Sequence, residues 1–92
     1  MALGGFLNMR LELRFFASTR EALGRSGFAV EFAHAPASVA DLVELIDPER
    51  QYEALRDARL RVAVNGRILE ADAPLIVQHG DEVAFLPAVT GG

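Results

Sequence analysis

The last three residues of this 92-residue chain, Thr90-Gly91-Gly92, are the positions whose residue types could do unusual chemistry. Glycine lacks a Cβ atom, so a Gly-Gly end is thin and can adopt backbone angles that other residues avoid. The segment from Ala88 can extend to roughly 17 Å, at about 3.3–3.6 Å per residue. We therefore expect it to enter a narrow channel and present its carboxylate to the active site of another protein.

Other reactive groups are scarce. The chain has no cysteine, which excludes disulfides, thiolate nucleophiles and zinc-cysteine sites. Every basic residue is arginine, so there is no lysine for a Schiff base. Ser18, Ser26 and Ser38 have no partners at the spacing of a catalytic triad. His34 and His79 are far apart and show no metal-ligand spacing, so we predict no catalytic residue of the chain's own and no metal site.

Charge and hydropathy narrow the class of partner. The net charge of −4 argues against a nucleic-acid partner, because phosphate binding needs clustered cations. No apolar run is long enough to span a membrane. Residues 1–8 lack the charged and apolar regions of a secretory signal. These features predict a cytoplasmic protein with neither a nucleic-acid nor a membrane partner.

Alternating apolar residues predict two strands in the first third of the chain. Residues 10–16 alternate, although Phe16 falls on the polar face at the end of the run. A second alternating run covers 28–33. The glycine-containing segment between them predicts a wide loop with one helical turn around 20–23.

The period then changes to that of a helix. Ser38, with Asp41 three residues later, resembles a capping box. The residues spaced for a single apolar stripe are Val39, Leu42, Val43 and Ile46. The helix should end at Asp47-Pro48, since the residue before proline avoids helical angles. A second short helix, mostly exposed, is predicted over 49–56.

A hairpin and a last strand complete the pattern. Asn65-Gly66, between apolar residues 62–64 and 67–69, is typical of a type I′ turn. A strand follows over 82–86 and ends at Pro87. This order predicts an α+β fold: a β-grasp, or ubiquitin-like roll, with a mixed four- to five-stranded sheet packed on one main helix, plus the short second helix.

The domain boundaries follow from these elements. We expect a flexible N-terminal extension over 1–8, a β-grasp domain over 9–87, and a flexible C-terminal tail over 88–92 that ends in Gly-Gly. In a β-grasp the first and last strands are central, adjacent and parallel. The likeliest such pair is 10–16 with 82–86.

Several motifs resemble the sulfur-carrier small subunits of molybdopterin synthases. The matching segments are Phe15-Phe16-Ala17, Arg20-Glu21, Gly24, 62–66, Asp72, Pro74-Leu75, 80–85, Pro87 and 89–92. The resemblance spans residues 10–92 and is most specific over the last thirty positions. Leu86-Pro87-Ala88 departs from the family, which more often has an aromatic residue and paired prolines there.

The resemblance implies a protein that carries sulfur rather than catalysing a reaction. Gly92 would be adenylated by a ubiquitin-activating-like enzyme that uses ATP, and then converted to a thiocarboxylate by a sulfur donor system. Val89, Thr90, Gly91 and Gly92 would insert into the large catalytic subunit, where the sulfur builds molybdopterin. The carrier itself would bind no cofactor.

The phase of the two central strands predicts a docking patch. Phe16 is out of phase with Leu13 and Phe15, and Leu86 is out of phase with Phe85. If the strands are parallel neighbours, both side chains project from the outer face beside the root of the tail. Arg20 would lie at the rim of this patch and Pro87 at the root, forming a partner interface.

Three alternatives remain open from the sequence. The chain could carry sulfur for thiamine-thiazole or cysteine synthesis, and its Pro-Ala-Val ending resembles a carrier of the cysteine type. It could be a ubiquitin-like modifier conjugated through Gly92 to lysines of other proteins. It could also be a plain interaction domain with an inert tail.

Overall fold

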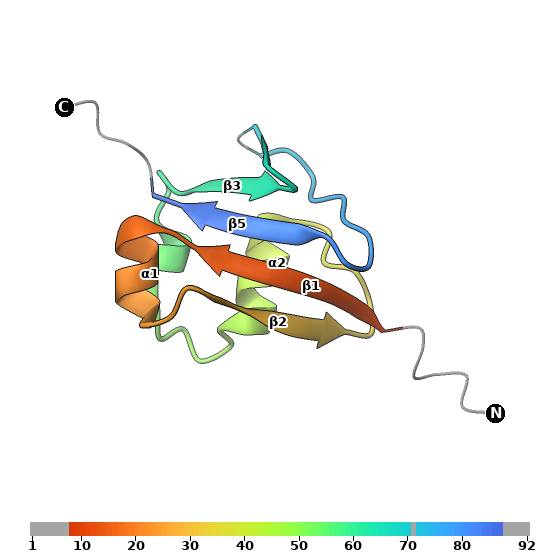
Figure 1. The fold of residues 1–92 in the computed structure, drawn as a ribbon, viewed down its shortest axis with the longest axis horizontal. Coiled ribbons are helices and arrows are strands. Elements are labelled where there is room, and N and C mark those ends of the chain that lie inside the picture. Colours follow the sequence, from red (N-terminus) through yellow and green to blue (C-terminus); the bar gives the residue numbers. More distant parts are fainter. Residues whose placement is uncertain (1–7, 71, 88–92) are drawn as a thin grey trace.

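The structure, a computed structural model, describes residues 8–70 and 72–87. Helices and strands alternate along the first half of the chain, and strands dominate the second half (Figure 1). The elements are β1 (Met9–Phe15), α1 (Ala17–Leu23), β2 (Gly27–Phe32), α2 (Val39–Ile46), η2 (Glu53–Arg56), β3 (Arg61–Val64), β4 (Arg67–Ile68) and β5 (Glu82–Leu86).

The strands form one mixed sheet in the order β2-β1-β5-β3-β4. The first and last strands are central and parallel, with Leu13 level with Val83 and Phe15 level with Phe85. The other neighbouring strands are antiparallel. The predicted β-grasp fold is therefore confirmed, and so is the predicted pairing of the first and last strands.

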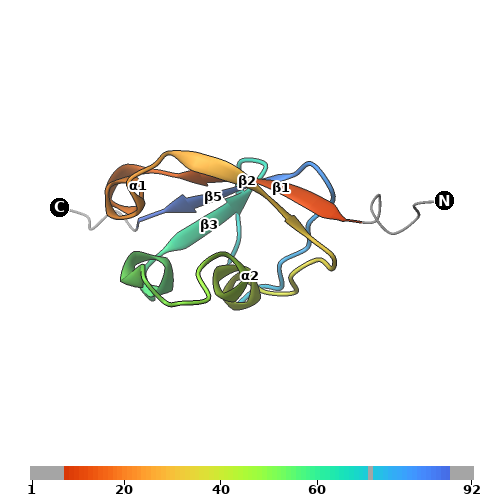
Figure 2. The same cartoon turned by 90° about the horizontal axis from the view of Figure 1, so that it is seen from below.

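The core lies between the sheet and α2, which covers one face of it (Figure 2). We call this face the inner face. Leu11, Leu13 and Phe15 of β1 are at most 1% exposed, as the alternation predicts. The ring of Phe15 lies 5.5 Å, centroid to centroid, from the ring of Phe85. Burying each such side chain stabilises the fold by about 1.5–3 kcal/mol.

Helix α2 has the predicted bounds and the predicted cap. The Oγ atom of Ser38 accepts a hydrogen bond from the backbone N–H of Asp41 at 3.0 Å. Leu42 and Val43 are buried against the sheet. The helix ends where the N–H of Asp47 donates to the carbonyl of Val43, directly before Pro48.

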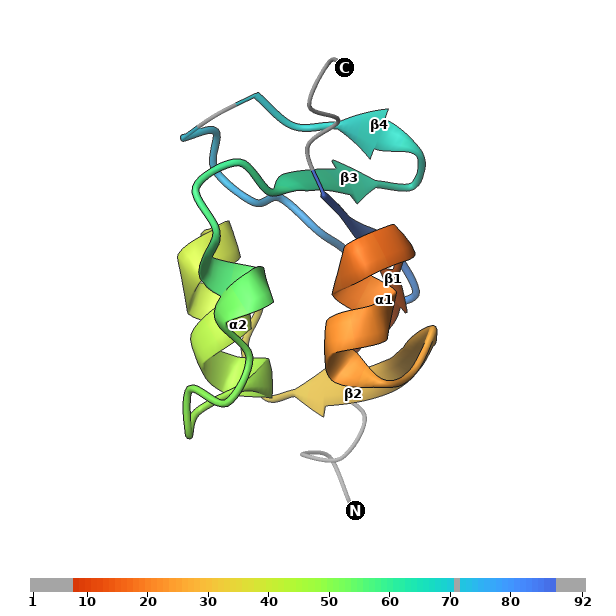
Figure 3. The same cartoon turned by 90° about the vertical axis from the view of Figure 1, so that its left-hand side faces the viewer.

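Helix α1 is longer than the single turn that the sequence predicts. It begins directly after Phe16 and ends at Gly24, whose φ of 77° forms a left-handed cap. Its buried side chains, Thr19 and Leu23, are spaced one helical turn apart. Two inward positions in seven residues are too few to show a helical period, so the sequence pattern did not reveal the whole helix. Figure 3 looks toward one end of the sheet and shows α1 in front of β1 and β5, with α2 beside it on the left.

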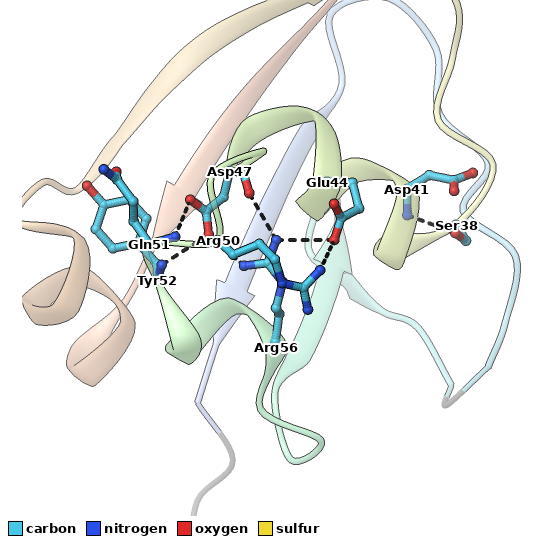
Figure 4. A network of polar contacts seen from close by, with 8 residues as sticks. All are labelled: Ser38, Asp41, Glu44, Asp47, Arg50, Gln51, Tyr52 and Arg56. Atoms are coloured by element: carbon cyan, nitrogen blue, oxygen red, sulfur yellow. Dashed lines mark hydrogen bonds and ion pairs between the residues drawn. The ribbon is translucent and has the colours of Figure 1, made fainter.

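The second predicted helix, over 49–56, is wrong in its first half. Only Glu53–Arg56 is helical, as the 3-10 turn η2, and its Leu55 is buried rather than exposed. The carboxylate of Asp47 accepts hydrogen bonds from the N–H groups of Gln51 and Tyr52 (Figure 4). The φ of Arg50 is 56°, outside the range of a right-handed helix, and this angle interrupts the predicted helix. The bonds to Asp47 then hold the segment that follows as a loop.

The boundaries of the predicted domain can be compared only in part. β1 begins at Met9, where the domain was predicted to start. Most of the predicted extension, residues 1–7, and the predicted tail, 88–92, lie outside the described residues. Their predicted flexibility stays a prediction. Among the described residues, no helix has the length and apolar character needed to cross a membrane.

Candidate functional site

The candidate site begins where β5 ends. Gly92 and the other predicted tail residues, Val89, Thr90 and Gly91, lie outside the described residues. The structure does show the place where the tail starts, at Leu86 and Pro87, which are both half-buried. Because β1 runs parallel to β5, the carboxyl ends of both strands meet at the same edge of the sheet.

The face of the sheet opposite α2, here called the outer face, carries every second residue of each strand. The register places residues of the same face level with one another across the strands. The outer-face positions of the four strands nearest the tail are Arg10, Glu12 and Arg14 on β1, Glu82, Ala84 and Leu86 on β5, Arg61 and Ala63 on β3, and Ile68 on β4.

Phe16 and Leu86 lie side by side at the root of the tail. The N–H of Phe16 donates to the carbonyl of Phe85 at 3.2 Å, which continues the β1–β5 pairing beyond the end of β1. Phe16 is 42% exposed although it follows the fully buried Phe15. The structure therefore places the two residues where the strand phase predicts. Their role in binding a partner stays a prediction.

Three further residues extend this apolar surface, and the sequence analysis missed them. Ala63 pairs with Ala84 on one side and with Ile68 on the other. Ile68 is 61% exposed, whereas both alanines are covered by their neighbours. We call Phe16, Leu86, Ala84, Ala63 and Ile68 together the outer strip. Residues 62–64 are all apolar, so they show no alternation. The two-residue Asn-Gly turn was the signal that could have revealed the pairing of Ala63 with Ile68.

Arg20, the predicted rim residue, lies one helical turn after Phe16, and its role at the rim stays a prediction. It is exposed, and its N–H donates to the carbonyl of Phe16 at 3.3 Å within the first turn of α1. Arg14, on the other side of Phe16 along the chain, forms a half-exposed ion pair with Glu82 at 3.1 Å. An exposed pair of this kind contributes little stability, about 0–1 kcal/mol.

The opposite end of β5 is fixed by the turn of the β3–β4 hairpin. The side chain of Asn65 donates to Asp81 at 3.0 Å and accepts from the N–H of Glu82 at 2.9 Å. Hydrogen bonds from Asn65 and from the N–H of Gln78 lower the pKa of Asp81 below its ordinary value. The start of β5 is thereby held in register, and its far end delivers Leu86 to the edge of the sheet.

The strip is exposed at its two ends, Phe16 and Ile68, whereas its two alanines are buried. A hollow of about 620 Å³ lies on the helix side between α2, η2, the start of β3 and the segment that follows β4. Its apolar walls include Val43, Leu55 and Val62, and no residue of the outer strip lines it. Among residues 8–70 and 72–87, no three acidic, histidine or cysteine side chains are grouped as metal ligands would be.

Comparison with known proteins agrees with this geometry. A model of the ThiS family matches residues 13–92. The chain is 38% identical to the molybdopterin synthase sulfur carrier subunit of Haemophilus influenzae over 84 residues, which cover 89% of this chain and 99% of that protein. It is 35% identical to the subunit of the same name from Escherichia coli over 82 residues, which cover 89% and 99% of the two chains.

Solved structures show the same fold. The solution structure of the Haloferax volcanii HVO 2177 protein superposes with a TM-score of 0.70, at 31% identity, and the match covers 94% of this chain and 89% of that one. The family match covers nearly the whole β-grasp domain, and the curated relatives match over almost their full length. This chain belongs to the ThiS family.

Proposed function

We propose that this chain is a sulfur carrier, the small subunit of a molybdopterin synthase, with Gly92 as the residue that bears the sulfur. The observation that carries the proposal is the extent of its similarity to curated sulfur carrier subunits, up to 38% identity over 99% of their length. The matched family region runs to Gly92 and so includes the Gly91-Gly92 pair.

The chemistry requires activation of a carboxylate by a partner. The carboxylate of Gly92 attacks the α-phosphate of ATP on a ubiquitin-activating-like enzyme and releases pyrophosphate, which leaves an acyl adenylate. A sulfur donor system then supplies a sulfur nucleophile, which displaces AMP and leaves a thiocarboxylate. The chain has no cysteine, so no side-chain thiol competes as the sulfur-bearing atom.

The outer strip serves as the docking surface in this proposal. Phe16 and Leu86 bind the partner beside the point where the chain enters it, Pro87 directs the chain away from the sheet, and Arg20 pairs with a partner carboxylate. The segment from Val89 to Gly92 inserts into the active site of the large subunit. Docking at the root of the tail limits the tail's search and raises the effective concentration of its end.

Mass spectrometry of the intact protein tests the carrier function. The chain is co-expressed with the adenylating enzyme and the sulfur donor system of the same organism. We expect a mass gain of about 16 Da, because one sulfur replaces one oxygen. A variant with an alanine added after Gly92 is the control and should show no gain. An unmodified wild-type chain under these conditions would contradict the proposal.

The same experiment separates the alternatives. A ubiquitin-like modifier would appear in conjugates of higher mass joined to lysines of other proteins. A carrier for thiazole or cysteine synthesis would gain the same sulfur, but it would not support molybdopterin formation with the large subunit of a molybdopterin synthase. An inert tail would leave every activity unchanged when Gly91 and Gly92 are deleted.

Docking is tested by changing the strip without changing the core. The double variant Phe16→Asp/Leu86→Asp places two charges on the exposed surface. We expect Kd for the large subunit to rise by about a hundredfold or more, because central apolar contacts dominate such interfaces. The melting temperature should change little. Equal affinity of the variant and the wild type, measured by calorimetry, would disprove a role for the strip.

A further inference from the structure

The charged residues of the outer face differ between the start and the end of β5. At the start of β5 the face carries Glu12 and Glu82, which are level with each other across the β1–β5 pairing. At the end of β5, Arg61 is the register partner of Leu86, and it also borders the hollow on the helix side. Arg10 pairs with Glu12 and Arg14 pairs with Glu82, so the charges of the face away from the tail compensate one another. Beside the tail, Arg61 has no such carboxylate partner among the described residues.

Arg61 and Arg20 stand on opposite sides of the apolar pair. Across the end of the sheet the order is Arg61 on β3, Leu86 on β5 and Phe16 after β1, and Arg20 follows one turn into α1. Leu86 and Phe16 are thus flanked by one cation on each side.

Both arginines are available to a partner. Each is exposed, and neither forms an ion pair with a carboxylate of residues 8–70 and 72–87. In the same part of the chain five other arginines do form ion pairs, namely Arg10, Arg14, Arg50, Arg56 and Arg59. The two cations that flank the tail root are therefore not neutralised by a close carboxylate within this region.

We propose that Arg61 acts with Arg20 as a two-sided electrostatic guide, and that the protein surface it fits is an apolar spot with carboxylates on both sides. This inference rests on the proposed function and names the chemistry of the partner's docking surface. A guanidinium forms strong, directional pairs with carboxylates. Two cations on opposite sides fix the orientation of the carrier and thereby aim the tail.

An acidic protein surface suits these residues better than a polyanion such as nucleic acid. The apolar pair between the cations would be left against water or phosphate in a nucleic-acid complex, whereas a protein surface can bury it. The net charge of −4 would also disfavour a long phosphate chain. A protein partner needs to meet only the end of the sheet at the tail.

The test uses the full chain and the large subunit of the same organism's molybdopterin synthase as the probe. The variants are Arg61→Glu, Arg61→Ala and Arg20→Glu/Arg61→Glu, and the adenylating enzyme serves as a second probe. Arg50→Glu is the matched control, because Arg50 has the same charge and is exposed but lies in the helix layer beside Glu44 (Figure 4). Kd and the association rate are measured from about 50 mM to 1 M NaCl.

We expect Arg61→Glu to raise Kd by about tenfold at low salt and the double variant by about a hundredfold, mainly by slowing association. Arg61→Ala should have a smaller effect, and Arg50→Glu should stay within about twofold. The differences should shrink in 1 M NaCl, where the Debye length is about 3 Å. Unchanged melting temperatures exclude misfolding as the cause.

Three results would overturn the inference. One is an Arg61→Glu variant that binds both probes as the wild type does or more tightly. The second is an effect that does not depend on salt or is matched by Arg50→Glu. The third is a wild-type chain that binds neither probe, which would overturn the proposed function as well. Loss of binding in Phe16→Asp/Leu86→Asp together with normal binding in Arg61→Glu would refute only the electrostatic guide.

Discussion

Phe85 and Leu86 are consecutive residues of β5, yet they lie on opposite faces of the sheet. Phe85 lies on the inner face and is fully buried under the helix layer. Leu86 lies on the outer face, half-buried, beside the exposed Phe16. Because a strand turns successive side chains to opposite faces, one short strand can supply both the core and a docking surface. Stability and binding should therefore be separable by mutation in this molecule.

The sharpest way to break the comparison is to truncate the two neighbours in turn. Phe85→Ala should lower the free energy of unfolding by about 3–5 kcal/mol, since it leaves a cavity beside Phe15. Leu86→Ala should cost less than about 1 kcal/mol, because the side chain is only half-buried and its removal leaves no enclosed cavity. Urea denaturation measures both. Similar losses of unfolding free energy in the two variants would mean that the outer-face residue contributes to stability as much as the core residue does.

Gly27 tests the edge of the same sheet, where backbone rather than side chain fills the space. A Cβ atom at Gly27 would lie 2.2 Å from the carbonyl oxygen of Leu13 on β1. We expect Gly27→Ala to cost about 2–4 kcal/mol, because β2 must move away from β1. Gly24→Ala, which meets open space at a φ of 77°, is the control and should cost only about 1–2 kcal/mol. Equal thermal stability of the two variants would contradict the clash.

The ion pair of Asp47 and Arg56 in the helix layer contrasts with the charges of the outer face, because it is largely buried. Burial alone would raise the pKa of Asp47. Hydrogen bonds from Arg56 and from the N–H groups of Tyr52 and Gln51 outweigh that effect and hold this pKa below its ordinary value. The Asp47 carboxylate should therefore stabilise the fold above about pH 4. That contribution should be lost as the pH falls through the lowered pKa of the folded state.

Asp47→Asn is expected to lower the melting temperature by several degrees at pH 7 and to make stability less dependent on pH below 5. Thermal melts at pH 7, 5 and 3 measure both effects. Asp57→Asn is the control, because the pKa of Asp57 is also lowered, by Arg59, but this pair is exposed. Its effect should be much smaller. Parallel pH profiles for the wild type and Asp47→Asn would refute the role of the buried carboxylate.

The smallest expected effect concerns the start of the helix that covers the inner face. Ser38→Ala removes the cap on the N–H of Asp41 and should cost about 1 kcal/mol. Ser38→Asp keeps an acceptor and should retain most of the stability. Chemical denaturation of the three proteins measures the difference. Because the outer strip does not depend on this cap, affinity for the large subunit should be unchanged. A loss of affinity would contradict the view that the outer face binds the partner independently of the helix layer.

Much of the fold was predictable because it rests on local patterns. The alternation of Leu11, Leu13 and Phe15 predicted a half-buried strand, and the Ser38 cap predicted where α2 begins. Asn65 and Gly66, with φ angles of 50° and 83°, form the predicted tight turn. Helix α1 and the loop before η2 were not predicted in full. One depends on two buried contacts, and the other depends on a carboxylate that bonds residues four and five positions later.

The candidate site divides in the same way. The sequence by itself determined the glycine end of the tail and the absence of cysteine and lysine side chains. It also determined the strand phase that turns Phe16 and Leu86 away from the core. Those properties reside in single residues and in a period of two. Only the tertiary structure decided that Ala63 stands level with Ala84 and that Arg61 stands level with Leu86. Such neighbours come from strands distant in the sequence, and their alignment is set by the pairing of the whole sheet.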